Sequence, residues 1–131
     1  MENIPTHALI VVADGTGARL FRNTSKTPHV SLRADGEFNP HHLDDDGPAG
    51  GRPPESTGQE TDEATFAKQL AKELYRRAHL GEFEHLVIVA DPQTLGQLRP
   101  SLHKEVQSRV LREVAKTLTN SPIKDIEATL S

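Results

Sequence analysis

Two aspartates directly follow the two most apolar runs of this sequence. Asp14 comes after residues 8–13, and Asp91 comes after Leu86–Ala90. Uninterrupted apolar runs of this length predict strands buried on both faces, and ligands gather at the carboxyl ends of such strands in open α/β sheets. If the two strands are parallel neighbours, the two carboxylates lie close together. The alternative, which we favour, is turn chemistry, because Asp-Gly and Asp-Pro commonly end strands.

A Gly-Thr-Gly sequence at residues 15–17 follows the first of these strands. After a buried strand, this pattern is similar to the start of a dinucleotide-binding fingerprint. The third glycine of that fingerprint would fall at Leu20, however, and no helical pattern follows. Because Asp-Gly-Thr-Gly tolerates positive φ angles, we instead predict a hairpin turn that leads into a second strand at residues 18–22.

Histidines and aspartates cluster in one polar segment. His41, His42 and residues 44–46 offer donors of the kind that divalent metals accept. Their spacing matches no known ligand signature, so we interpret the segment as a solvated acidic loop and predict no metal. The chain shows no nucleophile elbow, and no histidine is placed by spacing beside an acid and a nucleophile. The residues alone therefore predict no cofactor and do not indicate an enzyme.

The clearest helical pattern begins at Thr61. Its apolar positions repeat every three to four residues and predict one buried helix face. That face comprises Phe66, Ala67, Leu70, Ala71, Leu74, Tyr75 and Ala78. Thr57 with Glu60, or Asp62 alone, can cap the start of the helix. Gly81 suits the left-handed residue at its end.

The remaining elements are shorter. Residues 29–32 alternate and predict a third strand, whereas a polar stretch rich in glycine and proline predicts a long loop at about residues 34–60. Pro92–Leu98 predicts a short helix, and residues 121–130 predict a final one. Residues 106–118 fit both a helix and a strand, and their periodicity does not decide between the two. The order of elements predicts an α/β fold with a central mixed sheet of about five strands flanked by helices.

The composition limits the class of protein. A chain of 131 residues without cysteine fits a single domain, residues 1–131, with no disulfide. Its start lacks the features of a secretory signal, and no apolar run approaches the roughly 20 residues that cross a bilayer. We therefore expect a soluble, cytoplasmic protein with no membrane span. The net charge of -4 argues against a DNA-binding domain and requires any RNA contact to be local. Oligomeric state is not predicted.

Several segments together resemble a known bacterial family, the host attachment proteins. They are Val-Val-Ala-Asp-Gly at residues 11–15, Ala-Arg-Leu-Phe at 18–21, Phe-Ala-Lys-Gln-Leu-Ala at 66–71, Leu-Val-Ile-Val-Ala at 86–90 and Leu-Gly-Gln-Leu-Arg at 95–99. The same succession looks like the middle domain of archaeal and eukaryotic class-1 peptide release factors and of their ribosome-rescue relatives. The resemblance covers nearly the whole chain. It implies a release-factor middle-domain-like fold in which about residues 111–118 form a strand.

The resemblance also implies candidate site residues. In the release-factor domain, a long loop carrying Gly-Gly-Gln precedes the main helix and enters the peptidyl-transferase centre. The equivalent place here reads Thr-Gly-Gln at residues 57–59. The catalytic candidate is therefore Gln59, together with Gly58. The candidate binding residues are Asp14, Arg19, Gly58, Gln59 and Asp91.

Three functions stay open at this point. The name of the bacterial family implies a non-enzymatic cytoplasmic protein that affects attachment to host cells through a protein partner, and this is our first prediction. The alternative is a ribosome-associated release or rescue factor that uses residues 36–60 to contact the ribosome or tRNA. If the protein is an enzyme, it is then similar to a peptidyl-tRNA hydrolase. The weakest possibility is a small-molecule or metal module built on the two aspartates and the histidine-aspartate segment.

Overall fold

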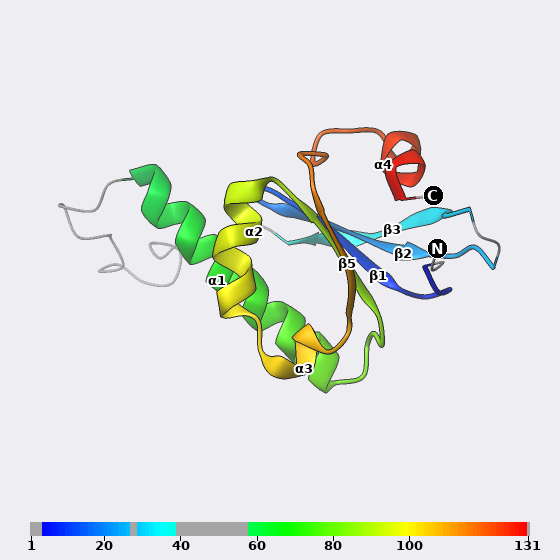
Figure 1. The fold of residues 1–131 in the computed structure, drawn as a ribbon, viewed down its shortest axis with the longest axis horizontal. Helices are drawn as coiled ribbons and strands as arrows, with labels where there is room; N and C mark the ends of the chain where they lie inside the picture. The colour runs from blue at the N-terminus through cyan, green and yellow to red at the C-terminus, as the bar shows by residue number, and fades with distance from the viewer. Residues whose placement is uncertain (1–3, 27–28, 39–57, 131) are drawn as a thin grey trace.

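The computed structural model describes residues 4–26, 29–38 and 58–130, and in residues 58–65 it describes the backbone. The chain forms one five-stranded mixed sheet with the strand order β3-β2-β1-β4-β5. Helices α1, α2 and α3 cover one face of the sheet, and α4 covers the other (Figure 1). The elements are β1 (Leu9–Ala13), β2 (Ala18–Asn23), β3 (Leu32–Phe38), α1 (Gly58–His79), β4 (Leu86–Ala90), α2 (Pro92–Leu98), the 3-10 helix η2 (Arg99–Ser101), α3 (Lys104–Gln107), β5 (Val110–Ala115) and α4 (Ile123–Leu130). The predicted α/β class with a mixed sheet of five strands is confirmed.

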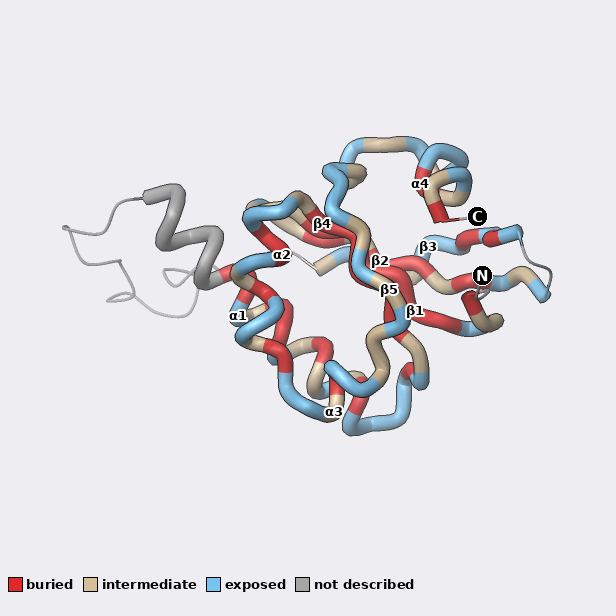
Figure 2. Tube along the Cα trace, in the orientation of Figure 1, coloured by how far each residue is buried: buried red, intermediate tan, exposed pale blue. Residues whose placement is uncertain are grey.

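The parallel pair of β1 and β4 forms the centre of the sheet. Leu9 is paired with Leu86, and Ala13 with Ala90, without a register shift. All ten residues of the two strands are buried, as Figure 2 shows for the middle of the sheet. Each strand has helical cover on both faces, which explains why its sequence is continuously apolar rather than alternating.

The predicted apolar face of α1 packs on this central pair. Phe66, Leu70 and Leu74 are fully buried and belong to one cluster with Val11 and Ile88. The helix ends where Gly81 adopts a φ of 77°, with the Glu82 N–H donating to the Arg77 carbonyl and the Gly81 N–H to the Ala78 carbonyl. These two bonds form a Schellman motif, so the predicted helix end is confirmed.

The apolar pattern of α1 begins later than the helix. The helix begins at Gly58 instead of Thr61. Asp62 therefore lies inside the helix and is not its cap, whereas a start at Gly58 agrees with the alternative cap, Thr57 with Glu60. Thr57 itself lies outside the described residues. Apolar periodicity locates only the turns that face the core, and the three additional residues, Gly58–Glu60, contribute no apolar side chain to the pattern.

The third strand was predicted three residues too early. It runs over Leu32–Phe38 instead of residues 29–32, so the predicted loop also loses its first residues. Phe21 is paired with Ala34 and Leu20 with Gly36, which leaves Asp35 as a β-bulge. Gly36 has a φ of 117°, a conformation that favours glycine. Pairing with β2 and this bulge extend a strand that its own polar sequence did not indicate.

The ambiguous residues 106–118 contain both kinds of structure. Val106 lies in the short helix α3, and β5 then runs parallel to β4 over Val110–Ala115. The predicted strand is thus confirmed in type, but it begins one residue before Leu111 and ends three residues before Leu118. Valines four residues apart fit a helical period even though they occupy two different elements here, which explains the conflict. The predicted helices at Pro92–Leu98 and near the C-terminus are confirmed.

A substitution in the buried face of α1 tests this packing. We expect Leu74→Ala to lower the free energy of unfolding by about 2–5 kcal/mol, because it removes a fully buried side chain and leaves a cavity. Urea denaturation measures the difference. Leu80→Ala, at a leucine that is 60% exposed, is the matched control and should change stability by less than about 0.5 kcal/mol. Equal effects of the two substitutions would contradict the placement of α1.

Candidate functional site

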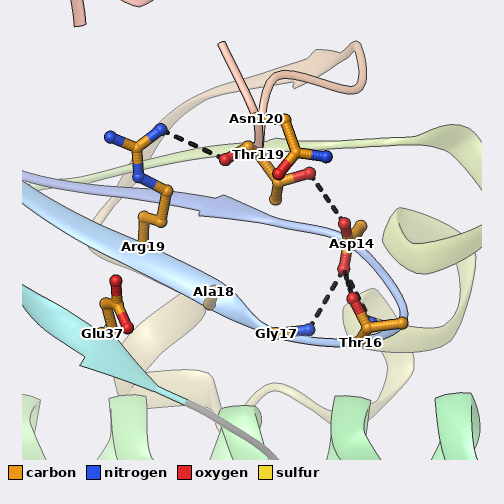
Figure 3. A pocket seen from close by; sticks show the side chains of 8 residues that line it. All are labelled: Asp14, Thr16, Gly17, Ala18, Arg19, Glu37, Thr119 and Asn120. Atoms are coloured by element: carbon orange, nitrogen blue, oxygen red, sulfur yellow. Dashed lines mark hydrogen bonds between the residues drawn. The ribbon is translucent and has the colours of Figure 1, made fainter. Parts of the chain in front are cut away.

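A solvent-open pocket of about 210 Å³ lies where the β1–β2 turn meets the connection between β5 and α4. Two of the predicted binding residues, Asp14 and Arg19, line it together (Figure 3). The complete lining comprises Asp14, Thr16, Gly17, Ala18, Arg19, Glu37, Thr119 and Asn120. The pocket therefore joins a hairpin near the start of the chain to a segment about a hundred residues later.

The carboxylate of Asp14 accepts hydrogen bonds on both oxygens. Oδ1 accepts from Thr16 N at 2.7 Å, from Thr16 Oγ1 at 2.7 Å and from Gly17 N at 3.1 Å. Oδ2 accepts from Thr119 Oγ1 at 2.7 Å. Burial acts to raise the pKa of Asp14, but the hydrogen bonds from Thr16, Thr119 and Gly17 outweigh it and lower the pKa below its usual value. A carboxylate that is ionised and bonded in this way stabilises the turn and is a poor general base.

The guanidinium of Arg19 binds the same distant segment. Its Nη1 donates to the carbonyl of Thr119 at 3.1 Å and to that of Ser121 at 2.9 Å. The guanidinium also lies over the ring of Phe21, 4.9 Å from its centroid. Asp14 and Arg19 thus form, with Thr119 and Ser121, a contact that we call the 14–19/119–121 latch. The latch fixes the chain immediately before α4.

Asp91 lies at the predicted place but does not line this pocket. Ala13 and Ala90 are paired, so Asp14 and Asp91 follow neighbouring strand ends. Asp91 caps α2, because its Oδ2 accepts from Thr94 N at 3.1 Å and its Oδ1 accepts from Thr94 Oγ1 at 2.7 Å. The two carboxylates share none of the hydrogen-bond donors found in the described part of the chain. Their geometry matches the turn chemistry that we favoured.

The Gly-Thr-Gly sequence forms the predicted hairpin. Asp14 N donates to the carbonyl of Gly17 at 3.0 Å, and β2 follows directly and runs antiparallel to β1. A dinucleotide-binding fingerprint requires a helix at this point. The strand that follows therefore excludes the dinucleotide interpretation of residues 15–17.

Gly58 and Gln59 are the first two residues of α1. In Figure 1, the first turns of this helix extend beyond the sheet and beyond α2. Further along, the ring of Phe66 stacks on that of Phe38 at the end of β3, with 5.9 Å between the centroids. Gln59 lies seven residues before Phe66, or about 10 Å along the helix axis. The candidate catalytic residue is therefore carried on a projecting helix whose base is packed on the sheet.

The structure does not test the predicted cluster of metal donors. His41, His42 and residues 44–46 lie outside the described residues. Within the described ranges, no group of three histidine, aspartate or glutamate side chains is arranged to hold a metal ion. None of the described helices is long and apolar enough to span a bilayer.

The residues that complete the pocket were not predicted from the sequence. Thr119 and Asn120 follow β5, and Glu37 is the cross-strand partner of Arg19. No local pattern marks the threonine and the asparagine, because their role depends on contacts with a hairpin far away in the sequence.

Residues 7–130 match the family described as bacterial archaeo-eukaryotic release factor family 12. The chain belongs to this family. Among solved structures, it is similar to one described as an archaeal protein, with 13% sequence identity and a TM-score of 0.48. That similarity covers 94% of this chain and 35% of the archaeal chain, so the chain spans about a third of its length. A comparison with curated proteins finds no match.

Family membership decides between the two resemblances that the sequence suggested. The similarity to release factors is confirmed at the level of the family. The prediction of a host attachment protein receives no support, since the matching family is one of release factors. The alternative function thus takes precedence over our first prediction.

The pKa of Asp14 gives a testable effect of pH on stability. Because the folded-state pKa is lowered, the ionised carboxylate stabilises the fold above about pH 4, and this contribution is lost as the pH falls through the folded-state pKa. We expect Asp14→Asn to destabilise the protein by about 1 kcal/mol at pH 7, a modest value because the carboxylate is partly exposed. Chemical denaturation from pH 7 to pH 2.5 should show that the difference in unfolding free energy between wild type and Asp14→Asn becomes smaller as the pH falls.

The control is Glu84→Gln, which removes one negative charge from an exposed residue before β4. It should leave the unfolding free energy within about 0.5 kcal/mol of wild type at both ends of the range. If the difference in unfolding free energy between wild type and Asp14→Asn stays constant with pH, ionisation of Asp14 has no role in the latch.

Proposed function

We propose that this protein is a ribosome-associated factor of the release or rescue type, which acts on peptidyl-tRNA through residues 36–60 and the start of α1. Membership of a release-factor family over residues 7–130 is the observation that carries the proposal. The position of Gln59 supports it, because a residue at the tip of a projecting helix can enter a narrow site while the sheet stays outside.

The proposed reaction is hydrolysis of an ester. A water oxygen attacks the carbonyl carbon that joins the peptide to the terminal ribose of tRNA, and the bond from that carbon to the ribose oxygen breaks. The peptide leaves as a carboxylic acid, and the proton from water restores the ribose hydroxyl. Gln59 orients the water by hydrogen bonding, which is positioning catalysis and needs no titrating side chain. The absence of a predicted nucleophile or base in the sequence is consistent with this chemistry.

The backbone at Gly58 fits the proposal in a specific way. A residue without a side chain at the helix start lets the neighbouring backbone approach a substrate closely. Only one glycine stands directly before Gln59, since residue 57 is threonine. We therefore assign the close approach to Gly58 alone.

The latch pocket has a different role in this proposal. The Asp14 carboxylate and one nitrogen of Arg19 are engaged by the turn and by residues 119–121. These contacts support a structural role, in which the latch holds α4 on the sheet and so stabilises the support of α1. The reaction itself is assigned to the start of α1, at Gly58 and Gln59.

A substitution of Gln59 tests the proposal. We expect wild type to co-sediment with bacterial ribosomes at low salt and to release peptide from peptidyl-tRNA bound to them. Gln59→Ala should keep the co-sedimentation and lower the release rate by about a hundredfold, because the water loses its orientation. The assay measures peptide release at several protein concentrations, which separates the rate from the affinity.

Gln107→Ala is the matched control, since Gln107 is an exposed glutamine on α3. It should leave both the release rate and the co-sedimentation unchanged. The ribosome association is overturned if wild type stays at the top of a low-salt gradient, and the hydrolytic role of Gln59 is overturned if Gln59→Ala releases peptide as fast as wild type.

A further inference from the structure

Three basic side chains follow one another along the outer face of α1. Lys68, Lys72 and Arg76 are spaced by four residues, so they lie on one side of the helix at intervals of about 6 Å. All three are exposed, and they lie opposite the buried face that contains Phe66 and Leu74. We call these three residues the basic stripe.

The basic stripe is unfavourable for the helix itself. Like charges four residues apart weaken a helix, and the stripe contains two such pairs. In the described part of the chain, neither Lys68 nor Lys72 makes an ion pair, although acidic residues outnumber basic ones in the sequence as a whole. Helix stability therefore does not explain these two lysines.

Attraction to the helix dipole explains only the basic residues at the C-terminal end of α1. Cations are favourable in the last turn, where Arg76, Arg77 and His79 lie. The effect falls off within that turn, and Lys68 and Lys72 lie in the middle of the helix. Their positions therefore point to a negatively charged partner outside the molecule.

Glu73 neutralises the stripe only in part. It bonds to Arg76 at 3.0 and 2.8 Å and also to Arg77 at 2.7 Å, so one carboxylate serves two guanidinium groups. The bond from Arg76 lowers the pKa of Glu73 to about 2, against the effect of burial and with help from Arg77. The side chain of Arg76 nevertheless stays 56% exposed. The ion pair thus orients Arg76 and leaves the stripe with a net positive charge.

We infer that the basic stripe binds the phosphate backbone of RNA and so guides α1 into its site. This inference rests on the proposed function. If Gln59 lies at the reacting ester, Lys68 follows about 13 Å behind it and Arg76 about 25 Å behind it along the same helix. A helix that enters an RNA-lined site tip first presents its outer face to the walls of that site. Cations at those positions replace counterions along the RNA backbone.

The double substitution Lys68→Gln with Lys72→Gln tests the stripe. Binding to purified 70S ribosomes, and separately to deacylated tRNA, is measured from 50 to 200 mM KCl. Each phosphate contact contributes about 0.7 to 0.9 to the slope of log affinity against log salt, so we expect the slope to fall by about 1.5. Comparison of the ribosome measurements with the tRNA measurements shows which of the two RNAs supplies the phosphates.

Two matched variants make the result specific. Lys116→Gln with Lys124→Gln removes the same charge from exposed lysines after β5 and on α4, and it should leave the slope unchanged. Lys68→Arg with Lys72→Arg keeps the charge and should restore the wild-type slope. Because all these side chains are exposed, thermal unfolding should be nearly the same for every variant.

The outcomes separate this inference from the proposed function. If Gln59→Ala abolishes peptide release while the Lys68 and Lys72 variant keeps the full salt slope, the stripe does not bind RNA and the proposed function stands. If the slope falls but Gln59→Ala has no effect on release, the stripe binds RNA and the hydrolytic role is wrong. If wild type binds neither ribosomes nor tRNA across the salt range, both are overturned.

Discussion

The fold depends on the parallel pairing of β1 with β4. Each strand is buried on both faces, and alternate residues supply the two halves of the core. Val11 and Ile88 contact the side of α1, whereas Val12 and Val89 contact the side of α4. Neither strand has a polar face that could lie against water. The pair therefore requires helical cover on both sides, and it makes the positions of α1 and α4 mutually dependent.

The two helices that cover the sheet, α1 and α4, are held in place in different ways. Helix α1 is long, and its burial of apolar residues such as Phe66 and Leu74 attaches it to the sheet. Helix α4 has only eight residues, of which Ile126 and Leu130 are buried. Polar contacts supplement this small apolar surface: the latch at Arg19 fixes the chain before the helix, and the Glu127 carboxylate accepts from Leu32 N at 2.7 Å. The short helix is thus positioned by hydrogen bonds just before its first residue and at Glu127 in its middle.

Local patterns predicted the elements whose structure is determined locally. The apolar runs that became β1 and β4 and the periodic face of α1 needed no information from elsewhere in the chain. The course of β3 was not predictable in the same way, because the bulge at Asp35 and the conformation of Gly36 arise from pairing with β2. The latch was even less predictable from the sequence. Arg19 was a candidate only through a family resemblance, and its partners at Thr119 and Ser121 are about a hundred residues away.

The chain as a whole is acidic, whereas the outer face of α1 at the basic stripe carries three cations. A net charge of -4 argues against a basic nucleic-acid-binding domain. Ions in solution, however, screen interactions between exposed charges beyond about 8–10 Å. A ligand at the outer face of α1 therefore senses mainly the nearby cations, and distant carboxylates weaken this field only slightly. In the RNA contact that we infer, the basic stripe is the place where an acidic protein meets RNA, and α1 sets the orientation.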